Sequence, residues 1–416
     1  MSAVAKYLQH YAEPESQWLE SFSYRFAQCL AIPMYKESPA NFDYFCDFAS
    51  LHPGTLLIIV LNRPVSDHEQ LWAQTLINSL STPLWQAAHH PLSYYPLAQH
   101  SGVLLVDRCV TGAAIATEQG VGLARKIAND IACQLIQRQQ IQQPWIFNTD
   151  ADARLPQDYF TSAEAFDSNK HAALLFSYQH IGANQPTLDT ATQLYELSLA
   201  YYVAGLAWAG SPYAYHTLGS IMVVNYKHYA QVRGFPKRAG AEDFYLLNKL
   251  AKTAAIVSLD TSISILSRAS NRVPFGTGPA VQQIIASGDY DAMPFYDPAI
   301  FHYLRAMLAI ISALANGATL QAALHTIDEP GVDKALLESA LIHFDLYKAL
   351  HHTNSHAKTQ TQRLRQLTTW FDSFKTLKFL HYIRDMAYPM LAYSEWQQAI
   401  KQQAFGQELQ LPELAS

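Results

Sequence analysis

Apolar runs of strand length alternate with a helical pattern along the first two thirds of the chain. Four runs are continuous in apolar or β-prone residues: Cys29–Tyr35, Thr55–Leu61, Gly102–Asp107 and Trp145–Thr149. Between the last two, Glu118–Gln139 has apolar residues at 121, 123, 127, 131, 132 and 135, the spacing of one helix face. Continuous apolar strands separated by helices predict an α/β fold with a mainly parallel sheet covered on both faces.

The pattern changes after about Asp291, where amphipathic helical stretches follow one another. We therefore expect an α/β domain over residues 1–290 and a helical C-terminal region over residues 291–416. The polar stretch His351–Gln362 predicts an exposed link between helices. Leu197–Tyr226 carries no charged residue and is long enough to span a bilayer. Glycines and a proline interrupt it, so we expect a buried helix and then a buried strand.

Composition narrows the classes of protein. Of the 416 residues, 50% are hydrophobic and 15% are charged, which is ample for a large core. The net charge of −6, without a basic run, gives no reason to expect nucleic acid as a partner. The four cysteines form neither a zinc-type spacing nor a disulfide framework, and no apolar signal core begins the chain. These features predict a cytoplasmic location.

Asp150 and Asp152 come directly after the run that ends at Thr149. Ligands of open α/β sheets bind beyond the carboxyl ends of the strands. Residues two apart in an extended segment point the same way, so the two carboxylates would repel each other unless a cation lay between them. Mg²⁺ or Mn²⁺ would suit these oxygens and would also bind phosphate. A solvated loop with a capping aspartate has the same sequence, and Pro156 suits the first turn of a following helix.

Five segments give these acids a context. In chain order they are "AIPMYKE", "GVGLARKIANDIA", "FNTDADARLPQDYF", "LGSIMVVNYKHYAQVRGF" and "GAEDFYLLNKL", within residues 31–250. Their order and spacing resemble the family 2 glycosyltransferases of the GT-A fold. The resemblance implies a GT-A-type sheet and transfer of a sugar from a nucleotide sugar.

The resemblance also implies a donor site. Asp150 and Asp152 would hold Mn²⁺ or Mg²⁺ against the diphosphate of the nucleotide sugar. Further residues at the family's nucleotide-binding positions are Pro33, Tyr35, Glu37, Gly122, Arg125 and Lys126. Gly122 would permit close approach, and Arg125 or Lys126 would reach the ligand. Ordinary packing with an exposed basic turn explains this helix start equally well.

On the acceptor side, the resemblance assigns the base that deprotonates the acceptor hydroxyl to Asp243, with Glu242 as its neighbour. Charge at a helix N-terminus is the alternative explanation of this pair. Gly219-Ser220 resembles the segment that lines the acceptor cavity. Arg268 and Arg272 lie in a loop-like stretch from which they would reach the diphosphate or an anionic acceptor, although a purely structural loop would look the same.

The chain departs from the family at one nucleotide-binding position. Many members carry "DDGS" after the second strand, where this chain has Asn62, and Asp107 after the third strand shares the task of contacting the base. The nucleotide therefore stays open. The "QxxRW" signature of processive synthases is absent, which disfavours a membrane polymerase and leaves at most peripheral contact with a membrane.

Three functions are compatible with these features. The favoured one is a metal-dependent glycosyltransferase that moves a sugar, with inversion, from a nucleotide sugar to a hydroxyl acceptor. The others are a sugar-1-phosphate nucleotidyltransferase and a non-catalytic GT-A scaffold that binds carbohydrate or a protein partner. The missing glycine-rich basic loop after the first strand disfavours the nucleotidyltransferase. The C-terminal helices would shape the acceptor site or contact a second copy of the chain.

Overall fold

The computed structural model describes residues 1–268, 276–402, 405–406, 409 and 411–412, and these form two compact units. The sheet unit holds Met1–Asn184 and Thr217–Pro279, and the helical unit holds Gln185–His216 and Ala280–Ser416. The helical unit thus includes a segment from the middle of the chain that we had grouped with the α/β domain. The functions assigned to the two parts stay predictions.

The sheet unit is built on a mixed sheet with ten strands in the described residues, in the order β3-β4-β5-β2-β1-β6-β9-β8-β10-β7. The first five strands in the chain are β1 (Gln28–Met34), β2 (Thr55–Asn62), β3 (Trp85–Gln86), β4 (Leu92–Pro96) and β5 (Gly102–Arg108). The others are β6 (Trp145–Asn148), β7 (Ala153–Arg154), β8 (His171–Ile181), β9 (Met222–Asn225) and β10 (Ala255–Leu266).

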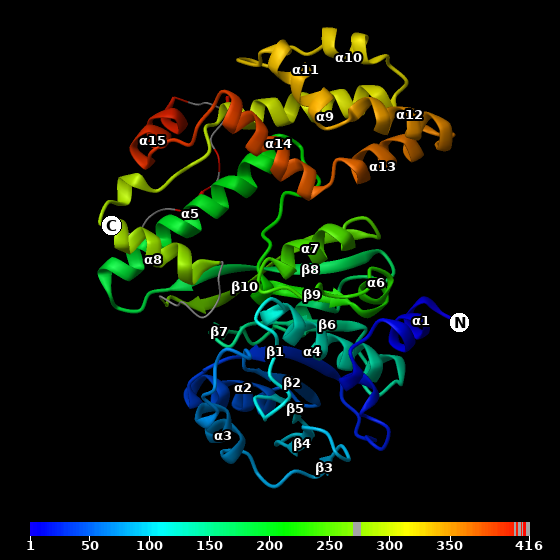
Figure 1. Cartoon of the computed structure of the whole chain (residues 1–416), viewed down its shortest axis with the longest axis vertical. Helices are drawn as coiled ribbons and strands as arrows, with labels where there is room; N and C mark the ends of the chain where they lie inside the picture. The colour runs from blue at the N-terminus through cyan, green and yellow to red at the C-terminus, as the bar shows by residue number, and fades with distance from the viewer. Residues whose placement is uncertain (269–275, 403–404, 407–408, 410, 413–416) are drawn as a thin grey trace. The chain divides into compact units, whose positions relative to one another are not determined.

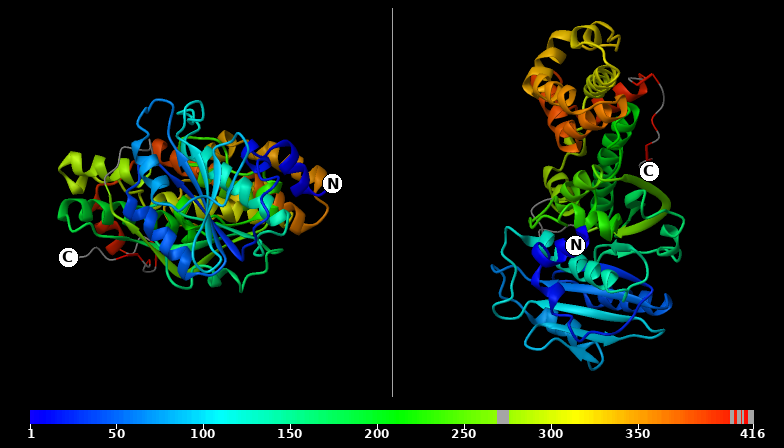
Figure 2. Two further views of the ribbon diagram at one scale, coloured as in Figure 1. Left: turned by 90° about the horizontal axis from the view of Figure 1, so that it is seen from below. Right: turned by 90° about the vertical axis from the view of Figure 1, so that its right-hand side faces the viewer.

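The central strands β5, β2, β1 and β6 are parallel and run side by side, as the blue-to-cyan arrows show (Figure 1, Figure 2). Nearly every residue of β1 and β2 is buried. Because successive side chains point to opposite faces, burial of all of them means that both faces are covered. All four predicted strands are confirmed to within two residues at each end. The parallel arrangement holds at the centre, whereas β3, β4, β7 and β9 pair antiparallel.

The carboxyl ends of many strands meet at one edge of this sheet, which we call the carboxyl edge. β5, β2, β1 and β6 end there because they are parallel. β9 is antiparallel to both β6 and β8, so β8 runs in the same direction as β6, and β10 is parallel to β8. Segments that follow β1, β6 and β10 in the sequence therefore begin at the same edge of the sheet unit.

The helices of the sheet unit are α1 (Ala3–His10), α2 (Pro39–Leu51), α3 (Leu71–Asn78), α4 (Gly120–Gln137), α6 (Tyr226–Gln231) and α7 (Glu242–Leu250). The long helix α4 confirms the predicted helical stripe and packs against β1 and β2. Most of its residues are buried, including several polar ones. A helix in this position can bring buried polar side chains close to the ends of the central strands.

The chain does not form the helix that we expected after Pro156. The Ala153 N–H donates to the Asp150 carbonyl over 3.1 Å and closes a turn. Ala153 and Arg154 then form the short strand β7, which pairs with β10. A proline suits a turn as well as a helix start, and here the Tyr159 N–H donates to the Pro156 carbonyl over 3.2 Å and closes a turn. Asp150 and Asp152 consequently lie in a turn, so the premise of alternating side chains along an extended segment was wrong.

The helical unit contains α5 (Pro186–Trp208), most of α8 (Thr277–Ser287), α9 (Ala299–Ala315), α10 (Leu320–His325), α11 (Lys334–His343), α12 (Leu346–His356), α13 (Gln360–Trp370), α14 (Ser373–Met386) and α15 (Tyr393–Lys401). A shared core joins α5 to α9 and α14. The expected helical character of this part is confirmed (Figure 1). The predicted link His351–Gln362 was wrong, because α12 and α13 take up all but residues 357–359. Polar composition there reflects exposed helix faces.

Within the described ranges, every helix is too short or too polar to cross a membrane. The uncharged stretch Leu197–Tyr226 contains the end of α5 and the whole of β9, which confirms the expected helix followed by a strand. The strand is buried throughout, whereas the helix shows both buried and partly exposed residues.

Candidate functional site

The Arg125 side chain joins the two acidic motifs of the sequence. It projects from α4 and is only 3% exposed. Its Nε donates to Glu242 Oε1 over 2.9 Å, and its Nη2 donates to Asp150 Oδ1 over 2.5 Å. One guanidinium therefore bridges the acid after β6 and the acid that begins α7. We call Arg125, Asp150, Glu242 and Asp243 the bridged cluster.

Gly219 and Ser220 shape the cluster from a second side. A Cβ atom added to Gly219 would lie 2.1 Å from Arg125 Nη2, so a side chain there would push the guanidinium out of its present position. The Ser220 hydroxyl donates to Asp150 Oδ2 over 2.5 Å. Both oxygens of Asp150 thus have donors. The resemblance had implied an acceptor-cavity segment here, and the observed contact is with Asp150.

A second guanidinium holds two further acids. Arg268 follows β10, and its Nε lies 2.8 Å from Asp152 Oδ2. Its Nη1 donates to Glu37 Oε1 and Oε2 over 3.0 and 3.1 Å. Asn41 also donates to Glu37 Oε2, over 3.2 Å. Residues that follow β1, β6 and β10 therefore meet in one ion-paired group at the carboxyl edge, as the shared direction of those strands requires.

The two arginines do not fully offset the cost of crowding acids together. Burial raises the pKa of Asp152 to about 6; Arg268 opposes the shift, while Asp150 and Glu37 add to it. Burial and, next, the neighbouring Glu242 raise the pKa of Asp243 to about 7. A hydrogen bond from the Phe244 N–H to Asp243 Oδ1 opposes this rise. Asp150 contributes to both shifts, so the two acidic motifs sense each other electrostatically.

Asp243 stands at the first turn of α7. The residue before the helix, Ala241, has φ +59°, a left-handed conformation that costs energy for a residue other than glycine. Glu242 is buried against Arg125, whereas Asp243 is only partly buried. The pair therefore divides into one acid that holds the arginine and one that is accessible with a raised pKa.

Two buried polar atoms beside Asp150 have no hydrogen-bond partner among the described residues. They are Arg125 Nη1 and Thr149 Oγ1, and Thr149 is fully buried. Leaving a buried charged donor unsatisfied is costly, which is why such atoms often mark the place of a ligand. An anionic oxygen would satisfy Arg125.

Asp150 and Asp152 are the candidate ligands of a divalent cation. In the part of the chain that the structure describes, no three His, Cys, Asp or Glu side chains gather into a metal-binding group. Asp150 and Asp152 offer hard carboxylate oxygens, but only two side chains. Mg²⁺ and Mn²⁺ are commonly held by one or two carboxylates together with phosphate oxygens. The residues therefore fit a cation that arrives with a phosphate ligand.

Other residues predicted to bind the nucleotide sugar also lie along the carboxyl edge. Pro33 is buried within β1, and Tyr35 donates to Asp67 over 2.9 Å. Asn62 ends β2, and its Oδ1 is buried without a partner among the described residues. Asp107, near the end of β5, accepts from the Cys109 N–H over 2.8 Å.

A cavity of about 480 Å³ borders Asp107, and its other walls include His90, Ser93 and Tyr95. It lies within the sheet unit, beside β4 and β5. Burial raises the pKa of the Asp107 carboxyl. The cavity is large enough for a nucleobase-sized ligand.

Gly122 and Lys126 have other surroundings. A Cβ on Gly122 would meet the Pro236 carbonyl at 2.5 Å and the Arg238 carbonyl at 2.6 Å, so the close approach there is to the protein's own backbone. Lys126 belongs to a separate network with the N-terminal residues. Arg272, the remaining predicted donor residue, lies outside the described residues.

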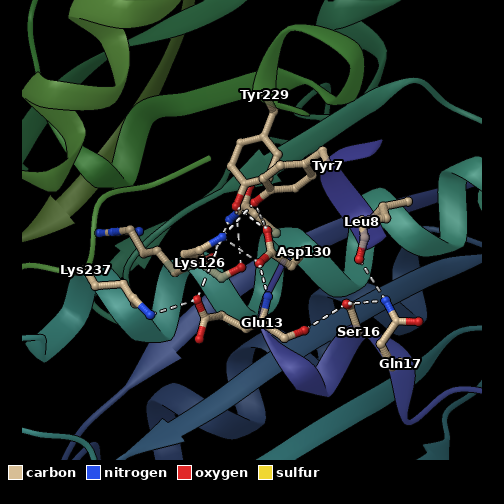
Figure 3. A network of polar contacts seen from close by, with 11 residues as sticks. Tyr7, Leu8, Glu13, Ser16, Gln17, Lys126, Asp130, Tyr229 and Lys237 are labelled. Carbon is tan, nitrogen blue, oxygen red and sulfur yellow. Dashed lines mark hydrogen bonds and ion pairs between the residues drawn. The ribbon is translucent and has the colours of Figure 1, made fainter. Parts of the chain in front are cut away.

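Figure 3 shows the network around Lys126 and Asp130. Lys126 Nζ donates to Asp130 Oδ2 over 2.8 Å and to the Tyr7 hydroxyl over 2.7 Å. Asp130 also accepts from the Tyr229 hydroxyl and the Glu13 N–H, each over 2.7 Å, and from the Tyr7 hydroxyl. These contacts fasten α1 and α6 to α4. Burial raises the pKa of Asp130, which Lys126 opposes.

Three contributions to the site were not predicted. The Ser220 hydroxyl donates to Asp150, and the Thr149 hydroxyl is buried without a partner among the described residues. Arg268, which was expected to reach a ligand, pairs with Glu37 and Asp152. The sequence held one usable signal. Lys126 and Asp130 are four residues apart on a helix, a spacing that favours an ion pair and argues against a free lysine.

Comparisons with known proteins add little. No family model matches the chain, and no curated protein matches it. Among solved structures, the chain is similar to a mannosyltransferase from Pyrobaculum calidifontis in complex with GDP-Man and Mn²⁺. The match covers 90% of this chain and 94% of that one, with 16% identity and a TM-score of 0.37. A TM-score below 0.5 carries no argument about the fold or function of this chain.

Proposed function

We propose that the chain is a metal-dependent, inverting glycosyltransferase that moves a sugar from a nucleotide sugar to a hydroxyl acceptor. The observation that carries this proposal is the Arg125 bridge between Asp150 and Glu242. It joins a carboxylate suited to the metal and diphosphate of a donor with the helix start that carries Asp243. Binding of the donor diphosphate and deprotonation of the acceptor must take place in one site. The buried Arg125 side chain contacts both motifs.

The donor half of the proposal is supported by the charges at the carboxyl edge. Asp150 and Asp152 would hold a divalent cation, which neutralises negative charge on the departing diphosphate. Arg125 Nη1, buried and without a partner among the described residues, would bind an oxygen of the same group. Tyr35, Asn62 and Asp107, near the ends of adjacent strands, are the candidates for contacts with the nucleoside.

The acceptor half rests on Asp243. In an inverting transfer, the acceptor oxygen attacks the anomeric carbon while the bond to the diphosphate oxygen breaks. Asp243 would accept the proton of the acceptor hydroxyl, and the nucleoside diphosphate would leave on the opposite side. A base works best when its pKa lies near the working pH, and burial raises the pKa of Asp243 to about 7. Glu242, held by Arg125, would fix the start of the helix.

The two alternatives make different demands. A sugar-1-phosphate nucleotidyltransferase would need basic side chains after β1 for the triphosphate, but Lys36 there pairs with Asp67 and Glu69 over 3.1 and 3.0 Å. A non-catalytic scaffold would have no use for a partly exposed carboxylate with a pKa near 7. The bridged cluster therefore favours the transferase.

Thermal unfolding tests the proposal. We expect one or more of UDP-, GDP- and dTDP-sugars to raise the Tm in the presence of Mn²⁺ and to raise it less without the metal, because a ligand that binds the native state stabilises it. Analysis of products would then separate sugar transfer from nucleotide exchange. A Tm unchanged by every nucleotide sugar, with or without Mn²⁺, would contradict the proposal.

A further inference from the structure

Arg268 holds two carboxylates that a bound donor would also need. Its Nε lies 2.8 Å from Asp152 Oδ2, and its Nη1 lies 3.0 Å from Glu37 Oε1. The Arg268 side chain is 34% exposed, whereas those of Asp152 and Glu37 are 14% and 6% exposed. Arg268 is therefore the most accessible of these three side chains.

Arg268 and a divalent cation compete for Asp152. Each is attracted by the same carboxylate, and two cations at neighbouring positions repel each other. The described residues offer no third acidic or imidazole ligand that would let the protein hold a metal by itself. A metal without phosphate would therefore have to displace Arg268 from Asp152. It would gain only that carboxylate and Asp150, whose two oxygens already accept from Arg125 and Ser220.

A diphosphate removes this conflict. It supplies additional oxygen ligands for the cation, and it offers the guanidinium a new anionic partner. Arginine binds phosphate through two parallel hydrogen bonds, so it loses little on leaving a carboxylate for a phosphate. Asp152 then becomes available to the metal.

We infer that Arg268 is a displaceable counter-ion, which pairs with Asp152 and Glu37 in the ligand-free protein and with the diphosphate in the donor complex. This inference rests on the proposed function. It makes metal and diphosphate binding mutually dependent: each prepares the site for the other, and neither binds well alone. Such reciprocal coupling is the defining property of linked sites.

Mn²⁺ binding measured by electron paramagnetic resonance tests the inference without an activity assay. The probes are Mn²⁺ alone and Mn²⁺ with inorganic pyrophosphate, UDP or GDP. In the Arg268→Gln variant, we expect about tenfold tighter binding of Mn²⁺ alone and about tenfold weaker binding of Mn²⁺ with a diphosphate, effects within the usual range of coupling between sites. Arg268→Lys, which keeps the charge without the bidentate geometry, should lie between wild type and Arg268→Gln.

Arg154→Gln is the matched control. Arg154 lies two residues from Asp152, donates to Asn41 Oδ1 over 2.8 Å, and stacks on the Tyr44 ring with 4.4 Å between its Cζ and the ring centroid. The control removes a nearby positive charge without removing the pair with Asp152. We expect its Mn²⁺ affinity without diphosphate to change much less than that of Arg268→Gln.

The outcomes separate the inference from the proposed function. Tighter Mn²⁺ binding by Arg268→Gln alone, together with a loss in the diphosphate complex, supports the inference. An Arg268→Gln variant with unchanged or weaker affinity for Mn²⁺ alone overturns it, while wild-type binding of Mn²⁺ with a nucleoside diphosphate leaves the proposed function standing. Absence of Mn²⁺ binding to wild type with every diphosphate overturns both.

Discussion

Arg125 and Lys126 are neighbours on α4 and are both almost fully buried, yet their networks differ. Lys126 pairs with Asp130, whose side chain is 0% exposed, and with Tyr7. Arg125 pairs with Asp150, whose side chain is 30% exposed, and one of its own nitrogens has no partner among the described residues. The central carboxylate of the first network is closed to solvent, whereas that of the second reaches the surface beside an unsatisfied donor.

This difference separates a structural from a functional use of buried charge. A buried ion pair costs desolvation, and complete hydrogen bonding around Asp130 offsets that cost and fixes the positions of α1 and α6. In the bridged cluster, part of the desolvation cost is not offset, because Arg125 Nη1 has no acceptor among the described residues. Such incomplete satisfaction is expected where a ligand completes the network. The comparison thus predicts that damage to one network lowers stability and damage to the other lowers binding or turnover.

The largest effect is expected from Asp243→Asn. The amide is nearly the same size but cannot accept the proton of the acceptor hydroxyl, so kcat should fall by about 10²- to 10⁴-fold. Donor binding, followed by thermal shift or calorimetry, should stay close to that of wild type. Turnover equal to wild type would remove Asp243 from the role of base.

The next effect tests the closed network. Asp130→Ala leaves Lys126 buried without its carboxylate, and we expect a loss of about 3–5 kcal/mol in the free energy of unfolding. Urea denaturation measures this loss. Binding of Mn²⁺ with a diphosphate to the folded fraction should be preserved. Wild-type stability in this variant would mean that the network around Asp130 contributes little to the fold.

A smaller effect is expected from Asp152→Ala. The variant should bind nucleotide sugar at least about tenfold more weakly in the presence of Mn²⁺, the scale on which groups that support a metal contribute. Without the metal, the variant should bind no more weakly than wild type, because Arg268 has lost a carboxylate that competes with the diphosphate. Isothermal titration with and without Mn²⁺ gives both values. An equal loss under the two conditions would show that Asp152 supports binding without contacting a cation.

The mildest perturbation is a change of pH. Because the pKa of Asp243 is raised to about 7, the base is protonated below that pH and cannot accept a proton. We expect kcat/KM to rise by about tenfold per pH unit between about pH 6 and 7 and to level off above about pH 7. Below about pH 6 the rise should be steeper, because Asp152 is protonated as well. Measuring kcat/KM across this pH range checks the expected rise. A flat profile between pH 5 and 8 would contradict the assignment.

The central strands and α4 were predictable because their signals are local and strong. Continuous apolar runs of strand length leave few alternatives, and the carboxyl edge follows from their parallel order. β7 and the turn before it were not predictable in this way. Pro156 suits either a turn or a helix. β7 itself forms only by pairing with Ser264 and Ile265, more than a hundred residues further along the chain.

In the candidate site, too, local signals were predictable and contacts between distant residues were not. The acidic positions were visible as motifs, but their partners were not, because Arg125 and Glu242 are 117 residues apart in the sequence. Helix geometry narrows one of these predictions. Adjacent residues on a helix do not face the same way, so only one of Arg125 and Lys126 is expected to reach a given ligand.

The membership of α5 in the helical unit has a consequence for how the protein is made. Trp208 of α5 donates to the Phe405 carbonyl, 197 residues later in the chain. Tyr201 of the same helix stacks edge-on against Phe301 and Trp396. During synthesis α5 emerges long before these residues, and its apolar side stays uncovered until they follow. A fragment that stops at residue 290 would carry α5 without the residues that cover its apolar side.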